Sequence, residues 1–524
     1  MITGKNYIGF SKSVESDTTV TSVNAFNGTV LEDNFFTATS DEIDKSVAKA
    51  KNAFIIYSKF SGAKKADFLD EIAKELESLG DELVQRASIE SGLPEGRFVG
   101  ERGRTTGQLR LFASLLRDGN WVESVIDTAL PDREPIPRPD IRKMLIPIGP
   151  VVVFTASNFP LAFSTAGGDT ASALASGCPV IVKAHESHLG VNDLVAGAII
   201  RAAQKTGMPD GVFSSLNGDG YSTGQNLVLH PGVKAVTFTG SFAGGKAIYD
   251  LAQNREEPIP VFAEMGSVNP VVLLEEKLEK EAEEIATLYA GSITLGVGQF
   301  CTNPGLLFGV KSKSLDEFSA KLAEKMDEVS PSSMLNEKIA KNYSTQRNEL
   351  ISDNEILLST KESSSVGVPT LAKTSGKKFL ENRKLHQEIF GPLSLLVECE
   401  DTSELEEVLS KLEGQLTGTI IGTDNDLIQH QKVIELLESK VGRLIFNAAP
   451  TGVEVSHAMN HGGPFPSTTD SRYTSVGTGA IKRFARPICY QGMPDSLLPD
   501  ELKNSNPMNI MRMINGGFTK SSIE

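Results

Sequence analysis

Short apolar runs and alanine-rich stretches alternate through the middle of the chain, from residue 151 to residue 262. Each run is continuously hydrophobic, as expected of a strand that is buried on both faces. This alternation is typical of a parallel sheet covered by helices, and it predicts an α/β fold with a Rossmann-like cofactor domain. Strands are expected at 151–154, 180–182, 235–238 and 261–262, and helices at 162–175 and 192–205.

The segments before this region are predicted to be helical packing material rather than part of a site. Residues 39–42 read Thr-Ser-Asp-Glu, a capping box that predicts a helix start, and further amphipathic helices are expected to about residue 116. Residues 131–139 contain four prolines, which predicts an extended connection. A strand is expected immediately after it, at 141–146.

Composition limits the class of partner. The chain has 524 residues, enough for about two or three domains. Its 51 Lys and Arg against 67 Asp and Glu give a net charge of −16, which disfavours binding to nucleic acid or to an anionic membrane. No apolar run is long enough to span a bilayer, and residues 1–5 begin no signal peptide, so we expect a cytoplasmic protein.

Four cysteines are widely separated, and none belongs to a paired motif: Cys178, Cys301, Cys399 and Cys489. This spacing argues against a disulfide framework or a zinc knuckle, so reduced thiols and no metal are expected. Two histidines four residues apart, His457 and His461, do not change this expectation. Ala458 stands where a metalloprotease helix has glutamate, and Gly462-Gly463-Pro464 ends any helix.

Cys301 lies on a flexible stretch, Gly296-Val297-Gly298-Gln299-Phe300-Cys301-Thr302-Asn303-Pro304-Gly305. Small residues allow close approach of a substrate and leave backbone N–H groups free to stabilise an oxyanion, as a cysteine nucleophile requires. On this stretch alone the alternative is a buried cysteine that only fills the core.

A carboxylate is predicted at the end of a buried strand. Glu264 follows the apolar residues 261–263 and precedes Gly266. Desolvation in such a setting raises the pKa of a carboxyl group, which favours a general base. By itself the pattern equally allows a capped strand end or half of a salt bridge.

A third segment, residues 147–160, is an apolar strand that leads into Asn158-Phe159-Pro160. Together the three segments resemble the aldehyde dehydrogenase superfamily, with its Asn-Phe-Pro, its Glu near Gly, and its Gly-Gln-x-Cys in family order. Ala156-Ser157 replaces the usual Pro-Trp, and residues 264–268 read Glu-Met-Gly-Ser-Val in place of Glu-Leu-Gly-Gly-Lys. The resemblance implies that Cys301 attacks an aldehyde, that Asn158 and the Cys301 N–H hold the oxyanion, and that Glu264 activates the hydrolytic water.

The resemblance also implies a dinucleotide site with NAD or NADP. Lys183 and Glu186 follow a strand and match residues that bind the adenosine ribose; a carboxylate at 186 would repel the extra phosphate of NADP, which favours NAD. Without the resemblance, these two residues could be a solvated surface pair. Glu388 and Phe390, in Gln-Glu-Ile-Phe-Gly-Pro, match residues at the nicotinamide end. The complete expected cofactor set is Phe154, Thr155, Lys183, Glu186, Gly240, Ser241, Glu388 and Phe390.

One alternative belongs to another class of protein. Residues 240–246 form Gly-x4-Gly-Lys, most of the phosphate loop of a phosphotransferase, after a predicted strand. Ala247 occupies the position of the Ser or Thr that holds magnesium, so we favour a dinucleotide at this helix start. A non-catalytic protein with the same fold is disfavoured because all three residues expected to perform chemistry are present.

Four segments near the C-terminus resemble the branch of the family that contains α-ketoglutaric semialdehyde (2,5-dioxopentanoate) dehydrogenases: residues 450–455, 461–472, 475–477 and 486–490. This implies oxidation of a short aldehyde with a distal carboxylate; a long-chain fatty aldehyde is the alternative. The carboxylate would need a cationic anchor, and Arg104, Arg110 and Arg472 are candidates, although an arginine more often forms a surface salt bridge.

Three ranges are expected from the resemblance. Residues 1–266 form an NAD(P)-binding domain, of which 121–146 contribute to a small β oligomerisation segment. Residues 267–450 form the catalytic domain, and 451–524 form a C-terminal segment with an oligomerisation strand. A homodimer or homotetramer is implied.

Overall fold

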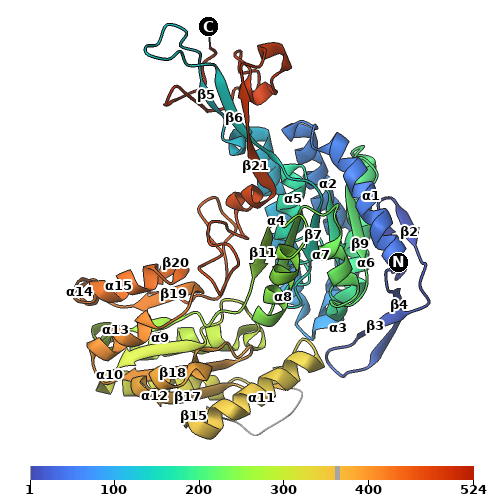
Figure 1. Cartoon of the computed structure of the whole chain (residues 1–524). Helices are drawn as coiled ribbons and strands as arrows, with labels where there is room; N and C mark the ends of the chain where they lie inside the picture. The colour runs from blue at the N-terminus through green and yellow to red at the C-terminus, as the bar shows by residue number, and fades with distance from the viewer. Residues whose placement is uncertain (1, 360–365, 524) are drawn as a thin grey trace.

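The computed structural model describes residues 2–359 and 366–523. It has two lobes, each built around a seven-stranded sheet, and an arm of β-strands that projects away from them (Figure 1). The α/β architecture expected from the sequence, with a Rossmann-like sheet, a second α/β lobe and a small β segment, is present.

The sheet of the first lobe has the strand order β11-β10-β7-β8-β9-β1-β2, and its first five strands are parallel. Since β8 and β10 lie on opposite sides of β7, the winding of the chain reverses between β7 and β10. Ligands bind at such a switch point, outside the carboxyl ends of the strands. The strands are β1 (Asn6–Ile8), β2 (Ser11–Ser13), β7 (Val151–Phe154), β8 (Val180–Lys183), β9 (Phe213–Leu216), β10 (Ala235–Thr239) and β11 (Val261–Glu264).

Helices cover both faces of this sheet, which explains why its central strand β7 is continuously apolar. Val151 and Val153 pack into a core with helices of one face, whereas Val152 and Phe154 pack with those of the other. The predicted capping box is confirmed, because Thr39 caps α1 reciprocally with Glu42. The helices are α1 (Ser40–Tyr57), α2 (Gly62–Ser78), α3 (Gly80–Ser91), α4 (Glu95–Asp118), α5 (Gly168–Ser176), α6 (Leu189–Lys205), α7 (Thr223–Leu229) and α8 (Phe242–Gln253).

The helix predicted at 162–175 begins later than expected. Residues before Gly168 form an irregular loop, because the carboxylate of Glu101 accepts hydrogen bonds from the backbone N–H groups of Leu161 and Ala162 at 2.8 and 3.0 Å. A side chain distant in sequence thus satisfies N–H groups near the predicted helix start.

The second lobe contains the sheet β15-β17-β18-β13-β12-β19-β20. Its strands are β12 (Val271–Leu273), β13 (Leu306–Val310), β15 (Glu355–Ser359), β17 (Thr370–Ser375), β18 (Leu393–Cys399), β19 (Gln415–Ile421) and β20 (Val441–Phe446). The helices are α9 (Glu275–Thr294), α10 (Lys313–Asp327), α11 (Glu337–Asp353), α12 (Gly376–Glu381), α13 (Thr402–Ser410), α14 (Asp424–Gln429) and α15 (Gln431–Glu438). Short 3-10 helices also occur, including η2 (Glu186–His188), η3 (Leu295–Gly298) and η4 (Arg383–His386).

The arm is a five-stranded sheet in the order β21-β6-β5-β22-β23, and Figure 1 shows the C-terminus beside it. The strands are β5 (Val125–Asp127), β6 (Ile141–Pro147), β21 (Ala485–Gln491), β22 (Arg512–Ile514) and β23 (Gly517–Thr519). The predicted strand after the proline-rich connection is therefore present as β6. Two further pairs are β3 (Thr19–Val23) with β4 (Val30–Phe36), and β14 (Ser332–Ser333) with β16 (Val366–Gly367).

All four cysteines are free thiols, as predicted. Within residues 2–359 and 366–523, no helix has the length and apolar character needed to cross a membrane. The first sheet ends with β11 and the second begins with β12, and we propose that the domain boundary near residue 266 lies between them. The three domain ranges remain predictions, and their outermost residues, Met1 and Glu524, lie outside the described residues.

Candidate active site

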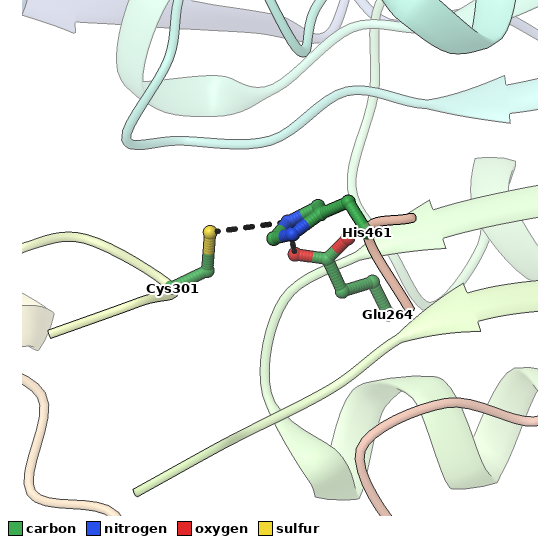
Figure 2. Close-up of side chains that lie close together, drawn as sticks. All are labelled: Glu264, Cys301 and His461. Carbon is green, nitrogen blue, oxygen red and sulfur yellow. Dashed lines mark hydrogen bonds and ion pairs between the residues drawn. The ribbon is translucent and has the colours of Figure 1, made fainter. Parts of the chain in front are cut away.

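Cys301, Glu264 and His461 come together from three distant parts of the chain (Figure 2). The Nε2 atom of His461 lies 3.0 Å from Oε1 of Glu264 and 3.5 Å from Sγ of Cys301. His461 and Glu264 are buried, whereas Cys301 is partly exposed. A nucleophile, an imidazole and a carboxylate thus form one hydrogen-bonded chain, the arrangement by which proteins activate a thiol.

Sequence reasoning missed His461, which it considered only as half of a metal pair with His457. The structure places His457 at the surface, with its Nδ1 3.3 Å from the hydroxyl of Thr478. His461 is held in an irregular loop, because its N–H donates to Thr474 Oγ1 and its carbonyl accepts from the N–H of Ser475. The Gly-Gly-Pro after His461 was a signal for such a fixed non-helical loop.

Glu264 is the last residue of β11, and the C-terminal loop is tied to this strand end. The N–H of Met265 donates to the carbonyl of Ser467, and the hydroxyl of Ser475 donates to Oε2 of Glu264 at 2.9 Å. Both carboxylate oxygens therefore have a partner. This explains why a histidine 197 residues away reaches Glu264.

The predicted rise in the pKa of Glu264 is wrong in direction. Burial raises it, as expected, but the imidazole of His461 and the hydrogen bonds from His461, Ser475 and Cys301 outweigh burial and lower the pKa below its ordinary value. The carboxylate is therefore ionised at neutral pH, and Nε2 of His461 carries the proton that it donates to Glu264.

Burial raises the pKa of the Cys301 thiol well above its usual value. The negative charge of Glu264 and its hydrogen bond with the thiol act in the same direction, whereas the guanidinium of Arg104 acts against them. A thiol in this setting stays protonated at neutral pH, so it needs an adjacent base to become a nucleophile.

The loop of Cys301 is fixed by backbone contacts. Gly298 has φ +65°, and a Cβ there would lie 2.3 Å from the backbone of Gly391, so the close approach requires glycine. The side-chain amide of Asn269 donates to the carbonyls of Cys301 and Asn303 at 2.9 and 2.8 Å. These contacts hold the thiol in place and join its loop to the segment that contains Glu388 and Phe390.

Asn158 lies beside this loop and is buried. One N–H of its amide donates to the carbonyl of Gln299 at 3.1 Å, which leaves the second N–H of the group free. The backbone N–H of Cys301 donates to no described residue. The second N–H of the Asn158 amide and the backbone N–H of Cys301 are therefore both available to stabilise an oxyanion.

Helix α4 belongs to this site, so the prediction that the N-terminal helices only provide packing is wrong. Arg97 donates to the carbonyl of Asn158 at 3.1 Å and forms an ion pair with Glu101 at 3.4 Å. Its guanidinium also lies over the rings of Phe159 and Phe300. The sequence showed that α4 is a long helix with polar residues, but it did not show which other residues those side chains contact.

Most of the predicted cofactor residues lie at the carboxyl edge of the first sheet. Phe154 and Lys183 are register partners at the ends of β7 and β8, and the hydroxyl of Thr155 donates to the carbonyl of Lys183. Gly240 and Ser241 follow β10, and Ser241 caps α8. Glu186 is exposed at the start of η2. These positions surround the switch point between β7 and β10.

The donor set at this edge fits a dinucleotide. The Lys183 side chain is buried and has no hydrogen bond or ion pair with another described residue, so its ammonium is available to a ligand. The start of α8 offers backbone N–H groups and the positive end of the helix dipole, suited to a pyrophosphate. The phosphate-loop alternative is not supported, because Lys246 is paired with Asp250 at 2.6 Å.

Glu388 and Phe390 line a cleft that also includes Ser267, Asn303 and Gly298. Burial raises the pKa of Glu388 to about 8, and the charge of Glu264 adds to it, although a backbone N–H at Ser267 partly offsets the rise. Gly266 makes room for this carboxylate, since a Cβ there would lie 2.7 Å from Oε2. The two predicted nicotinamide-end residues therefore lie next to the Cys301 loop.

The trio also has the ligand types of a metal site. The possible ligand atoms of Glu264, Cys301 and His461 all lie within 4.8 Å of one another. Among the residues that the structure describes, no other group of three or more His, Cys, Asp or Glu side chains could hold a metal ion. Free thiols close to His and Glu are equally typical of covalent catalysis. The expectation that no metal is needed stays a prediction.

Comparison with known proteins places this site in context. The sequence profile of the aldehyde dehydrogenase family matches residues 12–484. An α-ketoglutaric semialdehyde dehydrogenase of Acinetobacter baylyi is 47% identical over 99% of this chain and 99% of that protein. Alpha-ketoglutaric semialdehyde dehydrogenase 2 of Azospirillum brasilense is 46% identical over 98% of this chain and 99% of that protein.

A solved structure extends the comparison to the fold. The 1-pyrroline-5-carboxylate dehydrogenase from Thermus with bound NAD has a TM-score of 0.78, with 20% identity over 93% of this chain and 92% of that chain. At this level of identity, the likeness concerns the fold alone.

Proposed function

The chain belongs to the aldehyde dehydrogenase family and is an NAD(P)-dependent aldehyde dehydrogenase, and we propose that it oxidises 2,5-dioxopentanoate to 2-oxoglutarate with NAD. The observation that carries the chemistry is the hydrogen-bonded chain Cys301–His461–Glu264. The substrate is supported by two nearly full-length relatives whose names specify that semialdehyde. Neither the phosphotransferase nor the long-chain aldehyde alternative is favoured.

Activation of Cys301 begins the proposed reaction. The thiol proton moves to the carboxylate of Glu264, with which the thiol also hydrogen-bonds, while the N–H at Nε2 of His461 donates to that carboxylate and lies 3.5 Å from the sulfur. The thiolate then attacks the aldehyde carbon. Burial makes this base necessary, since it raises the pKa of the thiol well above its usual value.

Attack forms a C–S bond and leaves an alkoxide, which is a thiohemiacetal on Cys301. The free N–H of the Asn158 amide and the backbone N–H of Cys301 are assigned to this oxygen. Donors that are already fixed stabilise developing charge without reorganisation. Arg97 and Asn269 keep them fixed by binding the carbonyls of Asn158 and Cys301.

The cofactor is assigned to the residues at the edge of the first sheet and across the cleft. Lys183 and Glu186 would bind the adenosine ribose, Gly240 and Ser241 the pyrophosphate, and Glu388 the nicotinamide ribose, with Phe154, Thr155 and Phe390 around them. A nicotinamide held there would supply the hydride acceptor that is needed to convert the thiohemiacetal on Cys301 to a thioester.

Hydrolysis of the thioester needs a base that has lost the proton taken up earlier. Glu264 is suited to this, because its carboxylate form is stabilised by His461 and Ser475. It accepts a proton from water, whose oxygen attacks the thioester and releases the carboxylate product and the Cys301 thiol. The same residue therefore acts in both halves of the proposed reaction.

His461 is expected to control the reactivity of the thiol. Changing His461 to Asn removes the imidazole N–H that lies beside the sulfur and stabilises a thiolate, so the pKa of Cys301 rises further above its usual value. Since the thiolate fraction falls tenfold for each pH unit below the pKa, iodoacetamide should alkylate Cys301 about a hundredfold more slowly at neutral pH, with the pH profile displaced upward. His457→Asn, at an exposed position, is the matched control. An unchanged profile for His461→Asn would remove histidine from the mechanism.

Cofactor preference is expected to depend on Glu186. A carboxylate at the ribose hydroxyls repels the additional phosphate of NADP, so Glu186→Gln should raise the ratio of kcat/KM for NADP to that for NAD by about tenfold. Glu256→Gln, an exposed change elsewhere in the lobe, should leave the ratio unchanged. Initial rates with both cofactors give the ratio directly. A wild-type enzyme that prefers NADP would contradict the assignment.

The proposed substrate is tested by following reduced nicotinamide with 2,5-dioxopentanoate and with decanal. The account predicts a kcat/KM at least about a hundredfold higher for 2,5-dioxopentanoate, because a bound carboxylate contributes charge-assisted hydrogen bonds. A preference for decanal would support the fatty aldehyde alternative instead.

Self-association is also proposed. The arm carries exposed apolar side chains, including Leu130, Ile136 and Phe518, and its edge strand β21 is largely exposed. An unpaired strand edge with apolar neighbours favours pairing with another copy of the chain. We therefore propose a homodimer or homotetramer assembled through the arm.

A further inference from the structure

Helix α4 holds an arginine whose side chain is largely enclosed and lies over the ring of Phe163, but has no hydrogen-bond or ion-pair partner among the described residues. Nε and Nη2 of Arg104 are buried and donate no hydrogen bond to any atom of the described residues, and Arg104 forms no ion pair among them. Its neighbour Arg97, in contrast, is engaged by Asn158 and Glu101. A buried cation without a partner is unfavourable, so its presence beside a site indicates an anionic ligand.

Arg104 lies one aromatic ring away from the reacting groups. Its guanidinium carbon is 5.2 Å from the ring centre of Phe163, and the Phe163 ring is 6.2 Å from the ring of His461. His461 in turn is 3.5 Å from Cys301. The charges of Arg104 and Cys301 also influence each other: burial lowers the pKa of Arg104, and the negative charge of a Cys301 thiolate acts against this.

The other arginines considered are already occupied. Arg110 binds Glu77 with two hydrogen bonds of 2.6 and 2.8 Å, and Arg472 binds Asp470 with its side chain 77% exposed. Arg443 also interacts with the charge of Cys301, and its Nε is buried without a hydrogen-bond partner, but its Nη1 and Nη2 both donate, to the carbonyls of Gly452 and Pro450. Of the three candidates from the sequence, the structure leaves Arg104 with free donors next to the site.

We propose that Arg104 binds the distal carboxylate of the aldehyde substrate and so selects for acidic semialdehydes. Nε and Nη2 lie on one edge of the guanidinium group, the geometry that pairs with both oxygens of a carboxylate. In 2,5-dioxopentanoate the aldehyde and carboxylate carbons are about 5 Å apart when the chain is extended. This inference rests on the proposed function.

The test compares Arg104→Met with Arg110→Met, a control on the same helix, using 2,5-dioxopentanoate and the neutral aldehyde pentanal. Arg104→Met should raise the ratio of KM for 2,5-dioxopentanoate to KM for pentanal about a hundredfold, while the loss of its charge beside Cys301 should lower kcat for both substrates alike. Arg110→Met should change neither. Arg104→Lys keeps the positive charge but loses the two parallel N–H donors of the guanidinium, so it should raise KM for 2,5-dioxopentanoate by about tenfold. This variant replaces Arg104→Met in the test if Arg104→Met does not fold.

Each other outcome contradicts the proposal in a distinct way. If both substrates lose kcat equally in Arg104→Met and the ratio of their KM values is unchanged, Arg104 only stabilises the thiolate, and the anchor is wrong. If wild-type enzyme prefers 2,5-dioxopentanoate but Arg104→Met and Arg104→Lys do not weaken that preference, the proposed function stands and the anchor is elsewhere. If wild-type enzyme shows no preference for the acid over pentanal, the proposed function and the anchor are both wrong.

Discussion

Changing Cys301 to Ala should reduce kcat/KM for the aldehyde by at least about ten-thousand-fold, because every covalent step of the proposed reaction passes through this sulfur. His461 and Glu264 remain in the variant but have no nucleophile to activate. NAD binding should be preserved, since the assigned cofactor residues at the edge of the first sheet do not include the thiol.

Two measurements check this expectation. Initial rates give the loss of activity, and fluorescence titration with NAD gives the dissociation constant of the cofactor. Cys489→Ala, at an exposed position in β21, should retain full activity. Substantial aldehyde oxidation by Cys301→Ala would eliminate the covalent mechanism.

Changing Glu264 to Gln should stop the reaction at the thioester. The amide cannot deprotonate water, so steady-state kcat should fall by about a hundredfold to ten-thousandfold. The rate of thioester formation should fall less than the rate of hydrolysis, because His461 is 3.5 Å from the Cys301 thiol and can accept its proton in this variant. Rapid mixing should therefore show up to one equivalent of reduced nicotinamide per site, followed by a slow phase.

The size of the rapid phase separates the two roles of Glu264. A burst with slow turnover assigns its larger contribution to hydrolysis. A steady-state rate equal to that of the unaltered enzyme would exclude Glu264 as the base. Ser475→Ala removes one hydrogen bond to the carboxylate but keeps the base, so it should reduce kcat much less.

The parts of the fold that could be predicted are those coded by local patterns. The strand at 151–154 was located to the residue because both of its faces are buried, and the start of α1 because its capping box is local. The start of α5 was placed too early, because Glu101, which is remote in sequence, binds the N–H groups of Leu161 and Ala162. A one-dimensional pattern does not contain that contact.

The active-site residues that could be predicted are likewise those that belong to continuous sequence motifs. The motifs of Cys301 and Glu264 are continuous in sequence and were found, and the structure brings the two residues together. His461 is joined to them only by the path of the C-terminal loop, so its partners could not be read from neighbouring residues. The direction of the Glu264 pKa was mistaken for the same reason, since burial was evident from the strand but the donors opposing it were not.

The three arginines show what a structure adds to a list of candidates. Their sequence contexts were equivalent, yet two prove to be paired with acids and one has buried, unused donors. Nothing in the composition of α4 distinguishes Arg104 from Arg110, because the difference is which face of the helix each side chain occupies.

The most direct test of the central claim is the intact mass of Glu264→Gln enzyme after mixing with NAD and 2,5-dioxopentanoate and quenching in acid. The account predicts that the protein gains the mass of one 2-oxoglutaryl group and that peptide mapping places it on Cys301. Adding Cys301→Ala to the Glu264→Gln variant should abolish this increase in mass. An unmodified protein, despite reduced nicotinamide in the same sample, would mean that the aldehyde is oxidised without a thioester on Cys301, and the mechanism would be contradicted.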